Sequence, residues 1–187
     1  MGKSTTAQMF AERGVPVWDA DQAVHSAYGP SGAAVDAIEA LVPGSTGPEG
    51  VDRTRLKQEI GQKRGLLKQI EAIVHPLVAE DRAKFLESHR SIETDVVLLD
   101  IPLLFEAGGA ALCDYVVVVT APAETQRDRV LSRGSMTETQ FETILAAQLP
   151  DAEKRKRADF IIETTTLDSA RTAVDDILQI LRANPDA

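Results

Sequence analysis

Four short runs of β-branched and other apolar residues predict the strands of this chain. They show little alternation with polar residues, which is typical of strands covered on both faces of a parallel sheet. The runs are residues 15–18, 96–99, 115–120 and 160–163. Helical stretches separate the later runs, so right-handed crossovers give the simplest topology. The pattern therefore predicts an α/β fold with a parallel sheet.

Between residues 22 and 95 the periodicity becomes helical, and no run predicts a strand. Helices are expected at 33–41, 53–63 and 66–88, with a break or fresh start near His75 because Pro76 follows it. The Gly- and Pro-rich stretch 43–50 is predicted to be a surface loop. We interpret the region as a substrate-binding subdomain, with a purely structural cap as the alternative.

The first residues, Gly2-Lys3-Ser4-Thr5, match the second half of a Walker A phosphate loop. In the complete pattern, backbone amides surround the β-phosphate, the lysine reaches the β- and γ-phosphates, and the hydroxyl holds Mg²⁺. A helix is predicted over residues 6–13, ended by Gly14 in left-handed conformation. A Walker A helix follows a strand. We therefore expect a five-stranded parallel sheet whose first strand is missing from this chain, although a frayed terminus that matches by chance is the alternative.

Phosphoryl transfer requires charge neutralisation and a carboxylate near the accepting hydroxyl. Asp19 and Asp21 follow a predicted strand, and two carboxylates two residues apart on a strand end would point to the same side. One could act as a base and the other as a helper or a ligand of metal-bound water. The alternative is a capping role, with Asp21 as the N-cap of the next helix. Asp100 ends an apolar run in the manner of a Walker B element.

Other chemistry-bearing side chains are less clearly marked. Arg129 and Arg133 are four residues apart and would share a helix face, which suits a phosphate clamp. They precede residues 134–154, a polar start followed by a helix, which we interpret as a lid that closes over phosphates. A lone histidine in an apolar helix, such as His75, is more often a core residue than a catalyst. Trp18 is expected in the core.

Composition narrows the classes of partner. The 187 residues are 43% apolar, which suffices for one α/β domain with embellishments. The absence of an apolar run of membrane-spanning length and of a signal-peptide pattern predicts a soluble, cytoplasmic protein. The formal charge of −9 argues against a duplex nucleic acid partner. A single cysteine, Cys113, excludes an internal disulfide, and we expect it to be partly buried.

Basic residues are nevertheless clustered, so a small phosphorylated ligand remains compatible with the charge. The clusters are Arg53, Arg55 and Lys57; Arg127, Arg129 and Arg133; and residues 154–157. A solvated helix face is the alternative interpretation of each cluster.

Taken in order, these segments resemble the dephospho-CoA kinase family. The matching segments are 2–5, 14–17 with 19–21, 75–77, 99–106, 148–150 with Lys154, and 158–160. The resemblance implies a P-loop kinase core (1–21 and 96–187), a helical domain for the CoA-like substrate (22–95) and a lid (134–154). It also implies a phosphotransferase with an alcohol acceptor: ATP phosphorylates the ribose 3′-hydroxyl of dephospho-CoA, with Mg²⁺, to give CoA and ADP in the final step of coenzyme A biosynthesis.

The resemblance also implies roles residue by residue. Lys3 and Ser4 match the Walker A lysine and the Mg²⁺-binding hydroxyl, and Asp21 matches the carboxylate that activates the 3′-hydroxyl. The expected sites are catalytic Asp21, Lys3 and Arg133; ATP-binding Gly2, Lys3, Ser4, Thr5 and Arg129; and substrate-binding Asp19, His75 and Asp100. The expected partners are ATP and dephospho-CoA, with no nucleic acid or membrane, for a monomer or weak oligomer.

The chain departs from the family pattern at several places. The first strand and a Thr-Gly-Gly-Ile-Gly-Ser-like segment are missing, and His25, Ala79 and Ile144 stand where arginines are usual. Arg82, Arg129 and Arg133 are candidates to replace those arginines. We expect a translation start assigned at an internal Met, with about ten residues absent, and poor ATP binding by the chain as written, because most of the phosphate-binding amides and the ladder partners of a central strand would be lost.

Two other functions fit parts of the pattern. The first is another small-molecule P-loop kinase acting on a nucleoside, nucleotide or shikimate-like acceptor, which acceptor screening would distinguish. The second is a catalytically silent protein that binds dephospho-CoA or CoA and releases no ADP.

Overall fold

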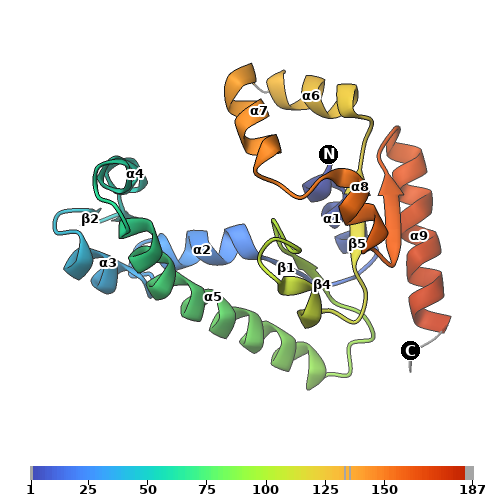
Figure 1. Ribbon diagram of the computed structural model, residues 1–187. Coiled ribbons are helices and arrows are strands. Elements are labelled where there is room, and N and C mark those ends of the chain that lie inside the picture. The colour runs from blue at the N-terminus through green and yellow to red at the C-terminus, as the bar shows by residue number, and fades with distance from the viewer. Residues whose placement is uncertain (1, 133, 135, 184–187) are drawn as a thin grey trace. The chain divides into compact units, whose positions relative to one another are not determined.

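The computed structural model describes residues 2–132, 134 and 136–183 (Figure 1). The chain divides into two compact units. A discontinuous unit comprises residues 1–17 and 95–187, and a helical unit comprises residues 18–94. Each unit has its own cluster of buried apolar side chains.

The discontinuous unit alternates strands and helices, as the sequence pattern predicts. Its elements are α1 (Lys3–Ala11), β4 (Leu98–Asp100), the 3₁₀ helix η1 (Gly109–Leu112), β5 (Val117–Thr120), α6 (Ala123–Leu131), α7 (Glu138–Ala146), α8 (Asp151–Lys156), β6 (Phe160–Glu163) and α9 (Leu167–Ala183). The runs 96–99, 115–120 and 160–163 correspond to β4, β5 and β6, so these three strand predictions are confirmed. Gly14 has φ of +79°, which confirms the predicted left-handed residue after α1.

Parallel pairing is present between β5 and β6, in a register that places Val117 opposite Phe160 and Thr120 opposite Glu163. A second pair joins β1 (Val17–Asp19) to β4. Just before β1, the Pro16 carbonyl accepts a hydrogen bond of 2.9 Å from the Leu98 amide. Within the described ranges no ladder joins β4 to β5, so these four strands form two pairs within the α/β fold that the sequence predicts.

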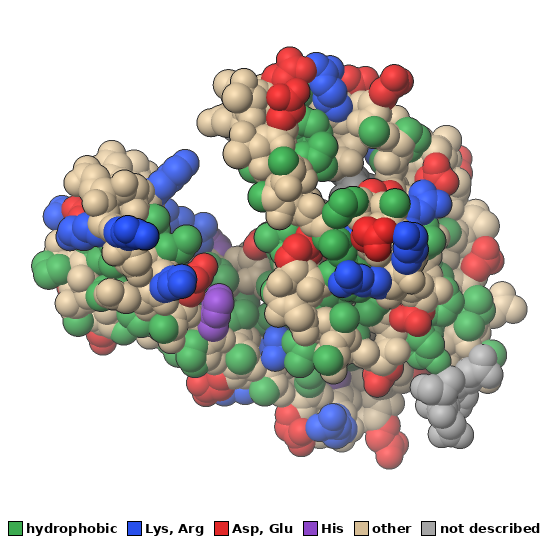
Figure 2. Space-filling model, viewed as in Figure 1, with side chains coloured by type: hydrophobic (Ala, Val, Ile, Leu, Met, Phe, Trp, Pro, Cys, Tyr) green, Lys and Arg blue, Asp and Glu red, His purple; other side chains and the backbone are tan. Residues whose placement is uncertain are grey.

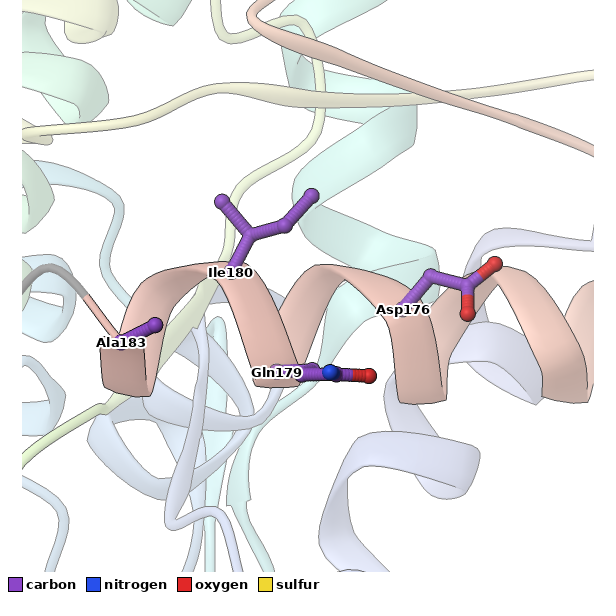
Figure 3. A pocket seen from close by; sticks show the side chains of 4 residues that line it. All are labelled: Asp176, Gln179, Ile180 and Ala183. Atoms are coloured by element: carbon purple, nitrogen blue, oxygen red, sulfur yellow. The ribbon is translucent and has the colours of Figure 1, made fainter.

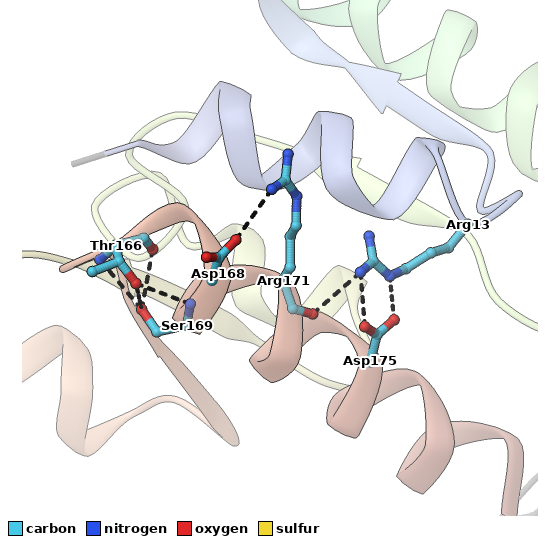
Figure 4. A network of polar contacts seen from close by, with 6 residues as sticks. All are labelled: Arg13, Thr166, Asp168, Ser169, Arg171 and Asp175. Atoms are coloured by element: carbon cyan, nitrogen blue, oxygen red, sulfur yellow. Dashed lines mark hydrogen bonds and ion pairs between the residues drawn. The ribbon is translucent and has the colours of Figure 1, made fainter.

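Helix α9 packs against α1 and β6 and closes the core of the discontinuous unit. The buried side chains there include Met9 and Phe10 of α1, Ile162 of β6, and Val174 of α9. A polar contact reinforces this packing: Arg13 pairs with Asp175 and also donates to the Arg171 carbonyl at 3.3 Å (Figure 4). The hydrogen bond from Arg13 lowers the pKa of Asp175. The end of α1 is thus fixed against α9.

The helical unit consists mainly of helices, as expected. Its elements are α2 (Ala20–Tyr28), α3 (Val35–Leu41), β2 (Thr46–Gly47), β3 (Gly50–Val51), α4 (Arg53–Gln62) and α5 (Leu66–Arg90). The helices predicted at 33–41, 53–63 and 66–88 correspond to α3, α4 and α5. Trp18 is 6% exposed, which confirms its predicted place in a core, and its indole donates to Asp81 at 2.6 Å.

The predicted break near His75 is wrong, because α5 continues through Pro76. Proline removes one backbone donor and crowds the preceding turn. Burial of Ile70 and Val74 just before it, with partly buried Leu77 and Val78 just after it, holds both halves against the same apolar cluster. Tertiary packing therefore outweighs the local cost of the proline.

The prediction of a plain surface loop at 43–50 is wrong in part, because this stretch contains most of a small antiparallel hairpin, β2 paired with β3. Gly50 has φ of +90° and is buried, and a Cβ placed there would lie 2.1 Å from the Tyr28 carbonyl oxygen. The Glu39 carboxylate accepts hydrogen bonds from the Gly44 and Thr46 amides, and these bonds, led by that of Gly44, lower its pKa. Each strand has only two residues, too few for a detectable alternation.

Candidate active site

Gly2 begins α1 in the left-handed conformation, with φ of +87°. No side chain caps this helix, and its first turn contains no acidic residue. Ser4 and Thr5 are exposed in that turn. A helix N-terminus presents unpaired amides and a positive dipole end, so this end of α1 can bind an anion such as phosphate.

The side chain of Lys3 pairs with the carboxylate of Asp100. Asp100 is the last residue of β4, as the Walker B interpretation requires, and its side chain is 5% exposed, whereas that of Lys3 is 44% exposed. A buried carboxylate needs a partner, and Lys3 supplies one. The pair places an ammonium group beside the first turn of α1.

Arg129 is held beside Gly2 through Thr164. Its guanidinium donates to the Thr164 hydroxyl at 3.0 Å and to the Thr164 carbonyl at 2.9 Å. A Cβ on Gly2 would lie 3.4 Å from the Thr164 methyl group, so the two residues are in close contact. The structure therefore links Arg129 to the start of α1 through Thr164. Its expected companion Arg133 lies outside the described residues.

Thr164 is itself fixed by the end of the neighbouring strand. Its amide and hydroxyl donate to the Thr120 carbonyl at 2.9 Å and 3.0 Å. The Thr120 hydroxyl donates in turn to both carboxylate oxygens of Asp151, each at 2.9 Å. Thr120 and Thr164 are 1% and 7% exposed. This buried chain of hydrogen bonds connects α8 to Arg129, and neither threonine stood out in the sequence because single threonines after apolar strands carry no motif.

Glu106 joins two of the segments that carry the family resemblance. It accepts hydrogen bonds from the Leu149 amide at 2.9 Å and from Lys154 at 2.9 Å. Burial acts to raise the pKa of Glu106, but the bonds from Lys154 and Leu149 outweigh it and hold the pKa below its ordinary value. The contact fixes the loop after Asp100 to the segment before α8, although the two are more than forty residues apart in sequence.

The helix predicted after the polar start of residues 134–154 is confirmed as α7. Thr137 is its N-cap, and a capping box links Thr137 and Gln140 in both directions. The interpretation of residues 134–154 as a lid stays a prediction.

The structure separates the roles of the two aspartates at the end of β1. Asp19, not Asp21, is the N-cap of α2: its carboxylate accepts from the Asp21 and Gln22 amides at 2.8 Å and 3.1 Å. The expectation of two carboxylates on one side of a strand is wrong, because the helix begins at Ala20. Asp21 lies in the first helical turn, exposed, and its carboxylate makes no hydrogen bond or ion pair with the described residues.

His75 is exposed on α5, so its interpretation as a core residue is wrong. Arg82 lies seven residues further along α5, and its guanidinium lies 5.9 Å from the centre of the Trp18 ring. Stacking on Trp18 gives Arg82 a defined structural role within the helical unit.

Cys113 is partly buried, as expected.

The described residues contain no group of three or more His, Cys, Asp or Glu side chains that could hold a metal ion. None of their helices has the length and hydropathy of a membrane span. A shallow groove follows one face of α9, lined by Asp176, Gln179, Ile180 and Ala183 (Figure 3). These positions recur at helical spacing on a single element, and none is a candidate for the chemistry described above.

Comparisons with known proteins agree with this geometry. A family model for dephospho-CoA kinase matches residues 1–169. A dephospho-CoA kinase of Cereibacter sphaeroides is 54% identical over 187 residues, which is 100% of this chain and 93% of that protein. A dephospho-CoA kinase of Ruegeria pomeroyi is 52% identical over 183 residues, which is 98% of this chain and 91% of that protein.

Solved structures extend the agreement to three dimensions. A crystal structure of a Thermus thermophilus protein matches with a TM-score of 0.78 at 31% identity, over 98% of this chain and 91% of that one. A dephospho-CoA kinase from Campylobacter jejuni matches with a TM-score of 0.71 at 25% identity, over 98% and 93% of the two chains.

Proposed function

The chain belongs to the dephospho-CoA kinase family, and from this premise we propose which residues and which ion carry its reaction. It is a transferase with the α/β fold of P-loop NTPases, and it uses ATP to phosphorylate dephospho-CoA in coenzyme A biosynthesis. We propose the ribose 3′-hydroxyl as the acceptor group. The observation that most supports the proposed site is the uncapped N-terminus of α1 beside the Lys3–Asp100 pair.

ATP phosphates bind at the start of α1. The amides of Gly2, Lys3, Ser4 and Thr5 donate to phosphate oxygens, and the Lys3 ammonium neutralises the β- and γ-phosphates. Asp100 orients Lys3 through their ion pair. Because Asp100 is nearly buried, it anchors the flexible lysine, and the remaining ammonium N–H groups can donate to the phosphates.

Mg²⁺ fits this site as an ion held partly by the substrate. The Ser4 hydroxyl is exposed in the first turn and makes no hydrogen bond within the described residues, and hard oxygen donors are the ligands that Mg²⁺ prefers. The described part of the chain offers no cluster of carboxylates for a closed cage, which suits an ion that keeps water and phosphate ligands. When bound, Mg²⁺ neutralises charge on the transferred phosphoryl group.

Asp21 is the proposed general base for the acceptor hydroxyl. Its carboxylate is exposed and has no competing partner in the described residues, so it can accept a proton from a bound hydroxyl. Asp19 fixes the first turn of α2 by capping it and thereby orients Asp21. We assign Asp19 a positioning role in place of a direct contact with substrate.

Arg129 binds phosphate from the side of α6, and residues 134–154 act as the lid. The two hydrogen bonds from Arg129 to Thr164 support this assignment, because they fix the guanidinium plane against a residue that lies close to Gly2. Arg133 completes the proposed clamp as a second catalytic cation. The capping box stabilises the start of α7, so the proposed lid contains a well-capped helix.

The helical unit is the proposed acceptor domain, with His75 among its substrate-contacting residues because it is exposed and has no hydrogen bond within the described range. We further propose a cytoplasmic monomer or weak oligomer with small-molecule partners only. The formal charge of −9 disfavours nucleic acid and anionic membrane surfaces as partners.

Dephospho-CoA-dependent ADP release tests the proposal directly. The protein is assayed with ATP, Mg²⁺ and a panel containing dephospho-CoA, nucleosides, nucleotides and shikimate. Of the acceptors in the panel, we expect only dephospho-CoA to support ADP release. The product should carry the new phosphate on the 3′-oxygen, as detected by ³¹P NMR. Equal or faster turnover of another acceptor would contradict the assigned substrate.

A further inference from the structure

Arg53, the first residue of α4, is held in place by two residues of α2. Its guanidinium nitrogen Nη2 lies 3.1 Å from Nδ1 of His25, and its Cζ lies 5.4 Å from the centre of the Tyr28 ring. A guanidinium that donates a hydrogen bond in its plane and also stacks on an aromatic face is restricted both within that plane and perpendicular to it.

No carboxylate among the described residues pairs with Arg53. Within the residues that the structure describes, it forms no ion pair with Asp or Glu, whereas Lys63 pairs with Glu59 and Lys84 with Glu80. Arg53 is oriented by the His25 ring nitrogen and the Tyr28 ring, which leaves its charge and its other N–H groups available to an external anion.

The charge around Arg53 also favours an anion. Residues 53–64 contain five Lys and Arg side chains against one acidic side chain, Glu59, in a protein with a formal charge of −9. Figure 2 shows Lys and Arg side chains gathered over the part of the helical unit that carries α4. A local positive potential raises the concentration of a polyanionic ligand at this surface.

The spacing on α2 links this cation to the proposed base. Asp21 and His25 are four residues apart on one helix, so their side chains lie on the same face about one turn apart. Dephospho-CoA carries its 3′-hydroxyl and, on the 5′-carbon of the same ribose, a diphosphate. A ribose with its 3′-hydroxyl at Asp21 can therefore direct its diphosphate along α2 towards Arg53.

We propose that Arg53, oriented by His25 and Tyr28, binds the diphosphate of the acceptor dephospho-CoA. Two charge-assisted hydrogen bonds from one planar group would fix the sugar relative to Asp21. The inference rests on the proposed function, because its ligand is the acceptor. His25 is a positioning residue here, since it acts on the substrate only through Arg53.

The test compares Arg53→Gln with Lys57→Gln, an exposed basic residue on the same helix with no such contacts. For Arg53→Gln we expect the KM for dephospho-CoA to rise about 10- to 100-fold, with the KM for ATP and the melting temperature unchanged. Arg53→Lys keeps the charge and should give an intermediate value. His25→Asn, which retains an acceptor atom, should stay near wild type, and His25→Leu should not.

A second measurement observes the diphosphate itself. In ³¹P NMR titrations without ATP, the two diphosphate resonances of dephospho-CoA should shift with wild-type protein and with Lys57→Gln, and much less with Arg53→Gln. An active wild type whose Arg53→Gln variant keeps its KM and its ³¹P shifts would overturn this inference alone. An inactive wild type would overturn the proposed function.

Discussion

The ammonium group of Lys3 is paired with the carboxylate of Asp100, which ends β4 and is almost completely buried. Lys3 therefore reaches solvent at the start of α1, and Asp100 anchors it from the end of β4. Because the lysine has a half-exposed side chain, phosphate can approach it without breaking the pair.

Replacing Lys3 with Met should lower kcat/KM by about 10²- to 10³-fold, because one charge that stabilises the transferred phosphoryl group is lost. The comparison is Lys156→Met, which removes an exposed lysine of α8 and should stay within about twofold of wild type. Steady-state ADP release measures both. Equal activity of the two variants would remove Lys3 from the proposed site.

The Thr164 hydroxyl should be needed for ATP affinity through Arg129. Thr164→Val keeps the shape and removes the hydroxyl, so we expect the KM for ATP to rise about 5- to 10-fold while kcat changes less. Thr164→Ser retains the donor and acceptor and should restore the wild-type value. Identical KM values for the Val and Ser variants would mean that the contact with Arg129 has no effect on nucleotide binding.

The close packing of the hairpin β2–β3 at Gly50 should contribute to the free energy of unfolding. Gly50→Ala should destabilise the protein by about 2 kcal/mol or more, because the residue has positive φ and its Cβ would overlap the Tyr28 carbonyl. Gly47→Ala is the matched variant, since a Cβ at Gly47 meets no atom within 4 Å. Urea unfolding followed by circular dichroism gives both free energies. A smaller loss for Gly50 than for Gly47 would contradict the packing described here.

Apolar runs were sufficient to locate β4, β5 and β6, and helical periodicity located α3, α4 and α5. Three features could not be found in this way, for physical reasons. The helix through Pro76 depends on burial of Val74 and its neighbours in a distant cluster. The cap of α2 depends on whether the strand ends at Asp19 or two residues later.

The third feature is the contact of Arg53 with His25, which joins two helices 28 positions apart. The sequence marked both residues, one as part of a basic cluster and the other as a departure from the family pattern, but nothing in it connects them. Long-range side-chain contacts of this kind follow from the packing of α2 with its neighbours and have no local signature.

The contact between Glu106 and Lys154 should make stability depend on pH in the acidic range. The folded pKa of Glu106 lies below its ordinary value of 4.5, so the contact stabilises the protein above about pH 4.5 and this contribution is lost as pH falls through the folded pKa. Glu106→Gln should cost about 1 kcal/mol at pH 7. The difference from wild type should shrink towards pH 3, as measured by urea unfolding; a constant difference would contradict the assignment.

The most direct test of the account is the activity of Asp21→Asn beside that of Asp36→Asn, which changes an exposed aspartate in the first turn of another helix of the same unit. In ADP-release assays with dephospho-CoA, ATP and Mg²⁺, we predict that Asp21→Asn lowers kcat by about 10²- to 10⁴-fold, with dephospho-CoA binding retained by calorimetry, and that Asp36→Asn stays near wild type. If Asp21→Asn keeps wild-type kcat, Asp21 is not the base, and the proposed mechanism is wrong.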